Sequence, residues 1–206
     1  IYKEVYSMAV EFRNSETKDN LMRAFAGESQ ARNRYTFAAE EAAAQKLYVV
    51  EAIFKFTAEQ ELAHAEVFYE KLKECAGENI CVDGCYPVDI TNSVIELLEK
   101  AEHNELEEYG DAYKNFADVA EQEGFLPIAN TFRQIAEIEK THAERFGTIA
   151  KLLREDKLFV ADAKVDWMCL NCGNIINTEK APSVCPVCSH ARGYFVRLAF
   201  APYTSR

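Results

Sequence analysis

Two short motifs in the chain place a glutamate and a histidine three residues apart, at Glu61-x-x-His64 and at Glu139-x-x-His142. Residues three apart lie on the same face of an α-helix, so each pair points in one direction and can hold a metal ion. A single pair of this kind in a Glu-rich helix is common by chance and usually lies on a solvated face. Two such pairs in one chain with only four histidines indicate a metal site.

A further glutamate precedes each motif at nearly the same offset: Glu28 lies 33 residues before the first motif and Glu105 lies 34 residues before the second. One glutamate from each of two helices and a Glu-x-x-His pair from each of two others form the ligand set of carboxylate-bridged di-iron or di-manganese bundles. Glu108 adds a fifth carboxylate, three residues after Glu105. Hard oxygen ligands with imidazole favour iron or manganese over a softer ion. The repeat predicts two helix hairpins related by a pseudo-twofold axis.

Two tyrosines share the faces of these glutamates. Tyr35 follows Glu28 by seven residues, which is two helical turns, and Tyr113 follows Glu108 by five. Each hydroxyl is a candidate to hydrogen-bond a ligand carboxylate. An ordinary core aromatic whose hydroxyl finds a nearby acceptor is an equally good interpretation. His103 falls nearly opposite the ligand face, and we expect it to be solvated.

Four cysteines near the end of the chain form two Cys-x-x-Cys pairs, Cys169 with Cys172 and Cys185 with Cys188. Four thiolates in a tetrahedron bind zinc or a single iron, and the spacing alone does not choose between these metals. About forty residues with few large aliphatic side chains are too few to fold without such a metal. A structural zinc ribbon, acting as an interaction module, is therefore an alternative to a redox site.

Three other cysteines, Cys75, Cys81 and Cys85, cluster around a loop that contains two glycines and a proline. Reduced thiols are the simplest interpretation, and a redox or metal-binding role is the alternative.

The ligands require long helices to carry them. Segments rich in Ala, Glu, Leu and Lys predict two helices between Thr17 and Cys75, with a break at 45–48 and a cap at Thr17 or Asp19. A loop over 76–87 leads to a third helix from Thr91 to Glu123, with its cap at Asn92 or Ser93, and a fourth runs from about Pro127 to Arg154. The fold class is thus mainly α, a four-helix bundle over residues 1–160 followed by a small β-rich metal domain over 161–206.

Composition restricts the partners of the chain. It has 206 residues, of which 49% are hydrophobic, and its formal net charge of −11 makes nucleic acid and anionic membranes poor partners. No segment approaches the roughly 18 apolar residues of a transmembrane helix. The first residues, IYKEVYSMAVEF, lack the pattern of a secretory signal. We therefore expect a cytoplasmic protein whose thiols are reduced.

Together these motifs resemble the rubrerythrin family over almost the whole chain. The segment Ala26–Tyr35 is similar to the first-helix motif of that family, and the two Glu-x-x-His motifs, the Glu105/Glu108 pair and the Cys-Pro-x-Cys tail follow in the family's order. Asn174 and Ser189 depart from the residues that usually follow the two cysteine pairs, and the loop carrying Cys81 and Cys85 is not a family feature.

The resemblance implies a ferritin-like bundle with a di-iron site, a rubredoxin-like domain with iron rather than zinc, and reduction of hydrogen peroxide to water in oxidative-stress defence. It implies electrons from reduced rubredoxin or a nicotinamide-dependent reductase, and a head-to-tail homodimer. It also implies that His64 approaches one iron in the reduced state and that Glu108 binds it in the oxidised state. A ferroxidase or ferritin-like iron-handling protein is the alternative, because its di-iron site would look similar.

Overall fold

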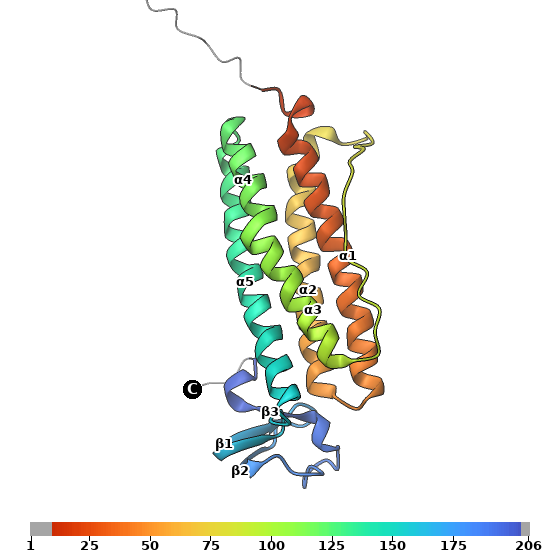
Figure 1. Cartoon of the computed structure of the whole chain (residues 1–206), viewed down its shortest axis with the longest axis vertical. Helices are drawn as coiled ribbons and strands as arrows, with labels where there is room; N and C mark the ends of the chain where they lie inside the picture. Colours follow the sequence, from red (N-terminus) through yellow and green to blue (C-terminus); the bar gives the residue numbers. More distant parts are fainter. Residues whose placement is uncertain (1–9, 203–206) are drawn as a thin grey trace, which may run out of the picture.

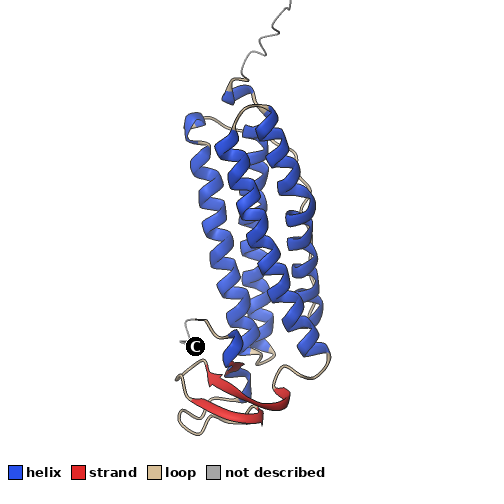
Figure 2. Ribbon diagram, turned by 90° about the vertical axis from the view of Figure 1, so that its left-hand side faces the viewer, coloured by secondary structure: helices blue, strands red, loops and turns tan. Residues whose placement is uncertain are grey.

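The long helical segments run side by side along one axis, and a small sheet covers one end of them (Figures 1 and 2). The structure, a computed structural model, describes residues 10–202, so residues 1–9, on which the expectation about a secretory signal partly rests, lie outside the described residues. The predicted fold class, a mainly helical ferritin-like bundle with a small β-rich domain, is confirmed. The helices are α1 (Glu16–Ala44), α2 (Tyr48–Lys71), α3 (Val94–Glu107), α4 (Tyr113–Gln122) and α5 (Leu126–Arg154).

The helix ends agree only in part with the predicted caps. α1 begins at Glu16, two residues earlier than a cap at Thr17 allows and four earlier than a cap at Asp19 allows, because the Ser15 hydroxyl caps it and accepts a hydrogen bond from the Lys18 amide at 3.0 Å. The prediction of a cap at Thr17 or Asp19 is therefore wrong. Ser93 caps α3, and Pro127 lies in the first turn of α5, where a proline lacks no helical hydrogen bond.

The predicted third helix is interrupted, so the expectation of one α-helix from Thr91 to Glu123 is wrong. Residues Glu108–Ala112 form a π-helical turn between α3 and α4, in which the Tyr113 amide donates to the carbonyl of Glu108, five residues back. A π turn accommodates one extra residue, and an α-helix rotates by about 100° per residue. Every side chain after this turn is therefore rotated by about that angle relative to an unbroken α-helix.

A crossover segment, residues 76–93, connects α2 to α3 and runs beside α1 for most of the bundle's length (Figure 1). Arg23 pairs with Asp83 at 2.9 Å and Arg34 pairs with Asp89 at 2.8 Å, so two arginines of α1 hold the segment in place. Because the chain returns to the end where α2 began, α2 and α3 point in the same direction. One long crossover of this kind is typical of ferritin-like bundles.

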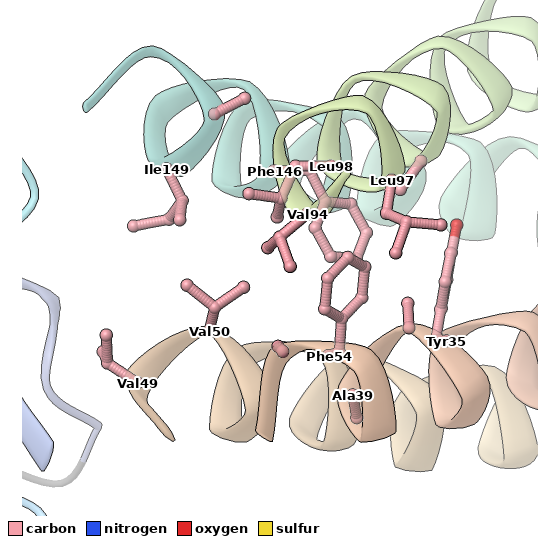
Figure 3. Packing of buried hydrophobic residues seen from close by; sticks show 14 of the residues in the cluster. Tyr35, Ala39, Val49, Val50, Phe54, Val94, Leu97, Leu98, Phe146 and Ile149 are labelled. Atoms are coloured by element: carbon pink, nitrogen blue, oxygen red, sulfur yellow. The ribbon is translucent and has the colours of Figure 1, made fainter. Parts of the chain in front are cut away.

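The bundle interior consists of two apolar clusters separated by the predicted ligands. Phe54 of α2 and Phe146 of α5 lie in the cluster nearer the sheet, where the α1–α2 hairpin faces α3 and α5 (Figure 3). Phe68 and Phe132 occupy the corresponding positions in the other cluster. All four phenylalanines are fully buried. Each lies seven residues, or two turns, from Glu61 or Glu139, so the carboxylates are enclosed by apolar rings on both sides.

The C-terminal sheet contains β1 (Val160–Cys169), β2 (Ile175–Lys180) and β3 (Phe195–Arg197), all antiparallel, in the order β2-β1-β3. Trp167 and Phe195 form its core with two of the cysteines. Val196 packs into the bundle cluster, which makes the two cores continuous. α5 ends at Arg154 and β1 begins at Val160, while the domain boundary at residue 160 stays a prediction.

The sheet domain contacts the turn between α1 and α2. Tyr194 stacks on Tyr48 with ring centroids 4.2 Å apart. The neighbouring Gly193 is buried, and a Cβ atom built there would lie 1.9 Å from the carbonyl oxygen of Lys46. Since that oxygen belongs to the backbone, only glycine permits this close approach. Among the described helices, none is both long and apolar enough to cross a membrane.

We predict that Gly193→Ala loosens the sheet domain from the bundle. The added methyl group has no space against Lys46, and overpacking of this kind costs about 1–3 kcal/mol. Thermal unfolding should shift to lower temperature, and limited proteolysis should cut the linker 155–159 faster. Gly110→Ala is the control, because a Cβ at Gly110 meets no atom within 4 Å and should not increase cleavage. Equal behaviour of the two variants would contradict the predicted contact.

Candidate metal centres

Six of the seven predicted bundle ligands converge halfway along the bundle. Each of four helices contributes: α1 and α3 supply one glutamate each, and α2 and α5 supply one Glu-x-x-His pair each. The carboxylates and the second histidine are at most 1% exposed, and His64 is 7% exposed. The converging residues are Glu28, Glu61, His64, Glu105, Glu139 and His142.

These residues form two ligand groups that share two carboxylates. The first group is Glu28, Glu61, His64 and Glu139, and the second is Glu61, Glu105, Glu139 and His142. Glu61 presents Oε2 to His64 Nδ1 at 3.1 Å and Oε1 to His142 Nδ1 at 2.9 Å. Glu139 does the same, at 3.0 Å and 2.8 Å. The glutamates of the two motifs are therefore placed to bridge two metal ions, and those of α1 and α3 to bind one ion each.

The polar atoms of this site fit a metal pair because many of them have no other partner. Oxygens of all four glutamates and both ring nitrogens of His142 are buried without a hydrogen-bond partner among the described residues. His142 Nδ1 is within 3 Å of two carboxylate oxygens and still makes no hydrogen bond of acceptable geometry. Orphaned buried polar atoms are costly, so their convergence on one point indicates bound cations.

Both predicted tyrosines hydrogen-bond a ligand carboxylate, and each one crosses to the other hairpin. The hydroxyl of Tyr35, on α1, donates to Glu105 of α3. The hydroxyl of Tyr113, on α4, donates to Glu28 of α1 at 2.5 Å. Both tyrosines are 2% exposed. These hydrogen bonds orient Glu105 and Glu28, the two glutamates that each belong to only one ligand group.

The π turn explains how the second tyrosine reaches its carboxylate. Glu28 and Glu105 are 77 residues apart, whereas Tyr35 and Tyr113 are 78 apart, as are His64 and His142. The second hairpin thus contains one extra residue between its glutamate and its tyrosine. Without the π turn, that residue would rotate Tyr113 by about 100° away from the ligand face. This one-residue change in offset is a sequence signal that analysis of the motifs missed.

Glu108, the seventh predicted ligand, lies on the π turn and outside both ligand groups. It is half-buried and lines a cavity beneath the crossover segment. His64, in contrast, lies inside the first group. His103 is exposed and takes no part in the site.

The four predicted cysteine ligands come together in the sheet domain. Cys169 and Cys188 are 3.7 Å apart at sulfur, as are Cys172 and Cys185. Gly173 after the first pair and Ser189 after the second both have positive φ, 74° and 62°. Ser189 therefore adopts the left-handed backbone conformation that glycine adopts most readily. Cys75 is buried, and Cys81 and Cys85 are exposed thiols of the crossover segment.

Comparison with known proteins agrees with this pair of sites. The sequence profile of rubrerythrin matches residues 19–150, and that of the rubrerythrin rubredoxin-like domain matches residues 167–196. The chain belongs to the rubrerythrin family. It is 41% identical to a rubrerythrin of Clostridium perfringens, covering 89% of this chain and 94% of that protein. It is 39% identical to a rubrerythrin of Porphyromonas gingivalis, covering 94% and 95%.

Solved structures agree with the assignment to the rubrerythrin family. The fully reduced, all-ferrous state of nigerythrin matches with a TM-score of 0.61 and 26% identity, covering 94% of this chain and 90% of that one. A bacterioferritin of Desulfovibrio desulfuricans, described with its di-iron site, matches with a TM-score of 0.61 and 24% identity, covering 69% and 82%. The second likeness shows the bundle fold alone. The expected cofactors, a di-iron pair and an Fe(Cys)4 ion, thus agree with the ligand sets and with the family.

Without metal, burial and the repulsion between neighbouring carboxylates shift the pKa values of the bundle ligands. Burial, followed by the charge of neighbouring carboxylates, raises the pKa of Glu28 and of Glu105 well above the usual range. Burial also acts to raise the pKa of Glu61, but the imidazoles of His142 and His64 close to its oxygens outweigh it and lower this pKa to about 2. Burial alone would lower the pKa of His64, but three carboxylate neighbours outweigh it and raise this pKa to about 12. Protons therefore supply the positive charge when metal is absent.

We predict that ferrous iron displaces protons when it loads this site. His64 is protonated at pH 7 without metal, and a metal-bound imidazole must be neutral, so at least one proton leaves when the first ligand group is filled. Binding should tighten as pH rises toward the pKa of about 12. The measurement is an anaerobic titration of iron into metal-free protein in weak buffer with a pH indicator. His103→Gln should release the same number of protons, and an unchanged pH in both proteins would contradict the prediction.

Proposed function

We propose that the protein reduces hydrogen peroxide to water, taking up two electrons and two protons for each peroxide and forming two waters. The observation that supports this most strongly is the presence, in one chain, of a shared-carboxylate pair of ligand groups and a four-cysteine site. The bundle ligands would hold two ferrous ions, which would supply the two electrons that peroxide accepts. The four cysteines would hold an iron ion able to pass electrons one at a time.

The bundle residues have distinct roles in this proposal. Glu61 and Glu139 hold both ions at a fixed separation, since each directs one oxygen toward each histidine. The two glutamates that bind a single ion are fixed by their tyrosines, and such supporting hydrogen bonds preserve ligand orientation when charge changes. The apolar rings on both sides exclude water from the ions.

His64 and Glu108 act as alternative ligands of the first group. The resemblance to the family suggests that His64 binds in the reduced state and Glu108 in the oxidised state. The positions of these residues support the reduced arrangement here, since His64 lies within the group and Glu108 faces the neighbouring cavity. Burial and nearby carboxylates raise the pKa of Glu108 well above its usual range, so its carboxyl group holds a proton until a cation replaces it.

The source of electrons is reduced rubredoxin or a nicotinamide-dependent reductase, which we propose to act at the four-cysteine site. We place the activity in the cytoplasm, because all seven cysteines are free and thiols persist in a reducing compartment. The rival function is ferroxidase activity for iron storage. An iron store has no need of a cysteine-bound electron inlet, so the sheet domain favours the peroxidase.

We predict that Cys172→Ser abolishes steady peroxide turnover while a pre-reduced bundle still reacts once. The variant lacks one thiolate of the inlet but retains all bundle ligands. Steady turnover is measured with an electron donor, and the single reaction is measured by mixing reduced protein with one equivalent of peroxide. The unaltered protein should be red, because ferric iron with four thiolates absorbs visible light and zinc does not. Colourless protein containing zinc, or equal loss in both assays, would contradict an electron inlet.

We also propose a head-to-tail homodimer in which the cysteine site of one chain serves the bundle of its partner. His142 lies 12 residues before the end of α5 at Arg154, or about 18 Å along the helix. The cysteines lie beyond that end, so the site of the same chain is distant. Electron transfer slows steeply with distance, which favours a partner packed alongside.

We predict that mixed dimers recover activity from two inactive variants. One variant lacks Cys172, and the other lacks Glu61 and His64. Each homodimer should be inactive, whereas a mixed dimer contains one intact inlet facing one intact bundle. Subunits are exchanged, mixed dimers are isolated with two affinity tags, and turnover is measured. Absence of turnover in confirmed mixed dimers would mean that each chain supplies its own site.

A further inference from the structure

A cavity of about 220 Å³ lies beneath the crossover segment, between α1 and the π turn. Its inner wall includes Gly27, Glu108 and Tyr113, and its outer wall is formed by the crossover residues Gly84, Cys85, Tyr86 and Pro87. These crossover residues have no role in the proposed binding of metal or transfer of electrons.

The inner wall of this cavity is one side chain away from the first ligand group. Tyr113 donates its hydrogen bond to Glu28, and Gly27 is the neighbour of Glu28 in the chain. Glu108 is the predicted ligand that stands outside both groups. A small molecule in the cavity would therefore contact the side chains that border the metals.

The ring of Tyr86 forms part of the outer wall. Its hydroxyl donates to the carbonyl oxygen of Arg23 at 3.1 Å, which holds the ring across the cavity. A Cβ atom at Gly27 would lie 3.8 Å from the Tyr86 ring, so the ring and α1 are already close. A ring held in this position would restrict passage to small molecules unless the ring moved.

The polar groups of the cavity suit a small hydrogen-bonding molecule. Glu108 and Asn104 line it, and so does Arg34, whose Nη2 has no hydrogen-bond partner among the described residues. A neighbouring cavity of about 350 Å³ under residues 87–91 is different, because Phe54, Leu97 and Ala101 form much of its wall and none of the seven predicted ligands lines it.

We propose that the cavity under Tyr86 is the entrance through which hydrogen peroxide reaches the first ligand group, and that Tyr86 sets the size of the hydroperoxide admitted. This rests on the proposed function for its substrate. The entrance itself is a property of the fold, and small anions that bind iron should use it too.

Two cysteines of the crossover segment provide a matched test on the full-length, iron-loaded protein. Cys85 lines the cavity, whereas Cys81 is also exposed but is not among the lining residues. In Cys81→Ser, N-ethylmaleimide modifies Cys85, and in Cys85→Ser it modifies Cys81. The buried Cys75 and the four ligand cysteines are the same in both variants, so any effect of modifying them is shared.

Two rates are compared before and after modification: hydrogen peroxide turnover, and the association of azide with the oxidised bundle followed by its absorption change. Modification of Cys85 should slow both at least tenfold, and modification of Cys81 should change neither by more than twofold. Equal effects in the two variants would overturn the proposal. The azide measurement decides the question even if the protein fails to reduce peroxide, which would instead refute the proposed function.

The size limit is tested by replacing Tyr86. Tyr86→Ala removes the ring and should raise the rate with tert-butyl hydroperoxide, relative to hydrogen peroxide, about fivefold or more. Tyr86→Phe keeps the ring and loses only the hydrogen bond to Arg23, so this ratio should stay near that of the unaltered protein. An unchanged ratio in Tyr86→Ala would show that the ring does not limit size, and a ratio raised equally in both variants would assign the effect to the hydrogen bond.

Discussion

The rest of the bundle depends on one electrostatic requirement, the neutralisation of four carboxylates buried between two apolar clusters. Like charges this close cannot remain ionised together without cations or protons beside them. Each helix must therefore bring its ligand to the same level, and the phenylalanines two turns above and below fix that level. The long helices, the paired hairpins and the crossover segment are the means by which the chain meets this requirement.

The sequence predicted the parts of the structure that follow from local periodicity. Residues at spacings of three and seven share a helical face whatever their surroundings, so the six converging residues were predicted as ligands from their spacing, and both tyrosines were candidates to hydrogen-bond a ligand carboxylate. The cysteine pairs were equally clear, because a Cys-x-x-Cys turn brings two thiolates together within a few residues. The bridging role of Glu61 and Glu139 was not assigned to particular residues, since it depends on how the two hairpins face each other.

Other features of the structure could not be predicted from local sequence patterns, and each has a physical reason. In the π turn, a backbone amide donates to the carbonyl five residues back instead of four, and helix propensities do not detect this difference. Only the changed spacing between glutamate and tyrosine in the second hairpin indicates it. Ser15 caps α1 because tertiary packing buries it at that point. The contact between Gly193 and Lys46, and the path of the crossover segment against Arg23 and Arg34, join residues far apart in sequence, so no short window contains both partners.

Glu108, on the π turn, makes the surroundings of the two ligand groups chemically different. The hairpins otherwise match in their glutamates, histidines, tyrosines and phenylalanines, and two ions in matched surroundings would hold an electron with equal affinity. Glu108 has no acidic equivalent on α1, where Ala31 stands three residues after Glu28. Only one half of the duplicated site therefore has a further carboxylate beside its ligands. An ion that this carboxylate joined would be stabilised in its oxidised state relative to its neighbour, so one acidic side chain would set the order in which the two ions are oxidised.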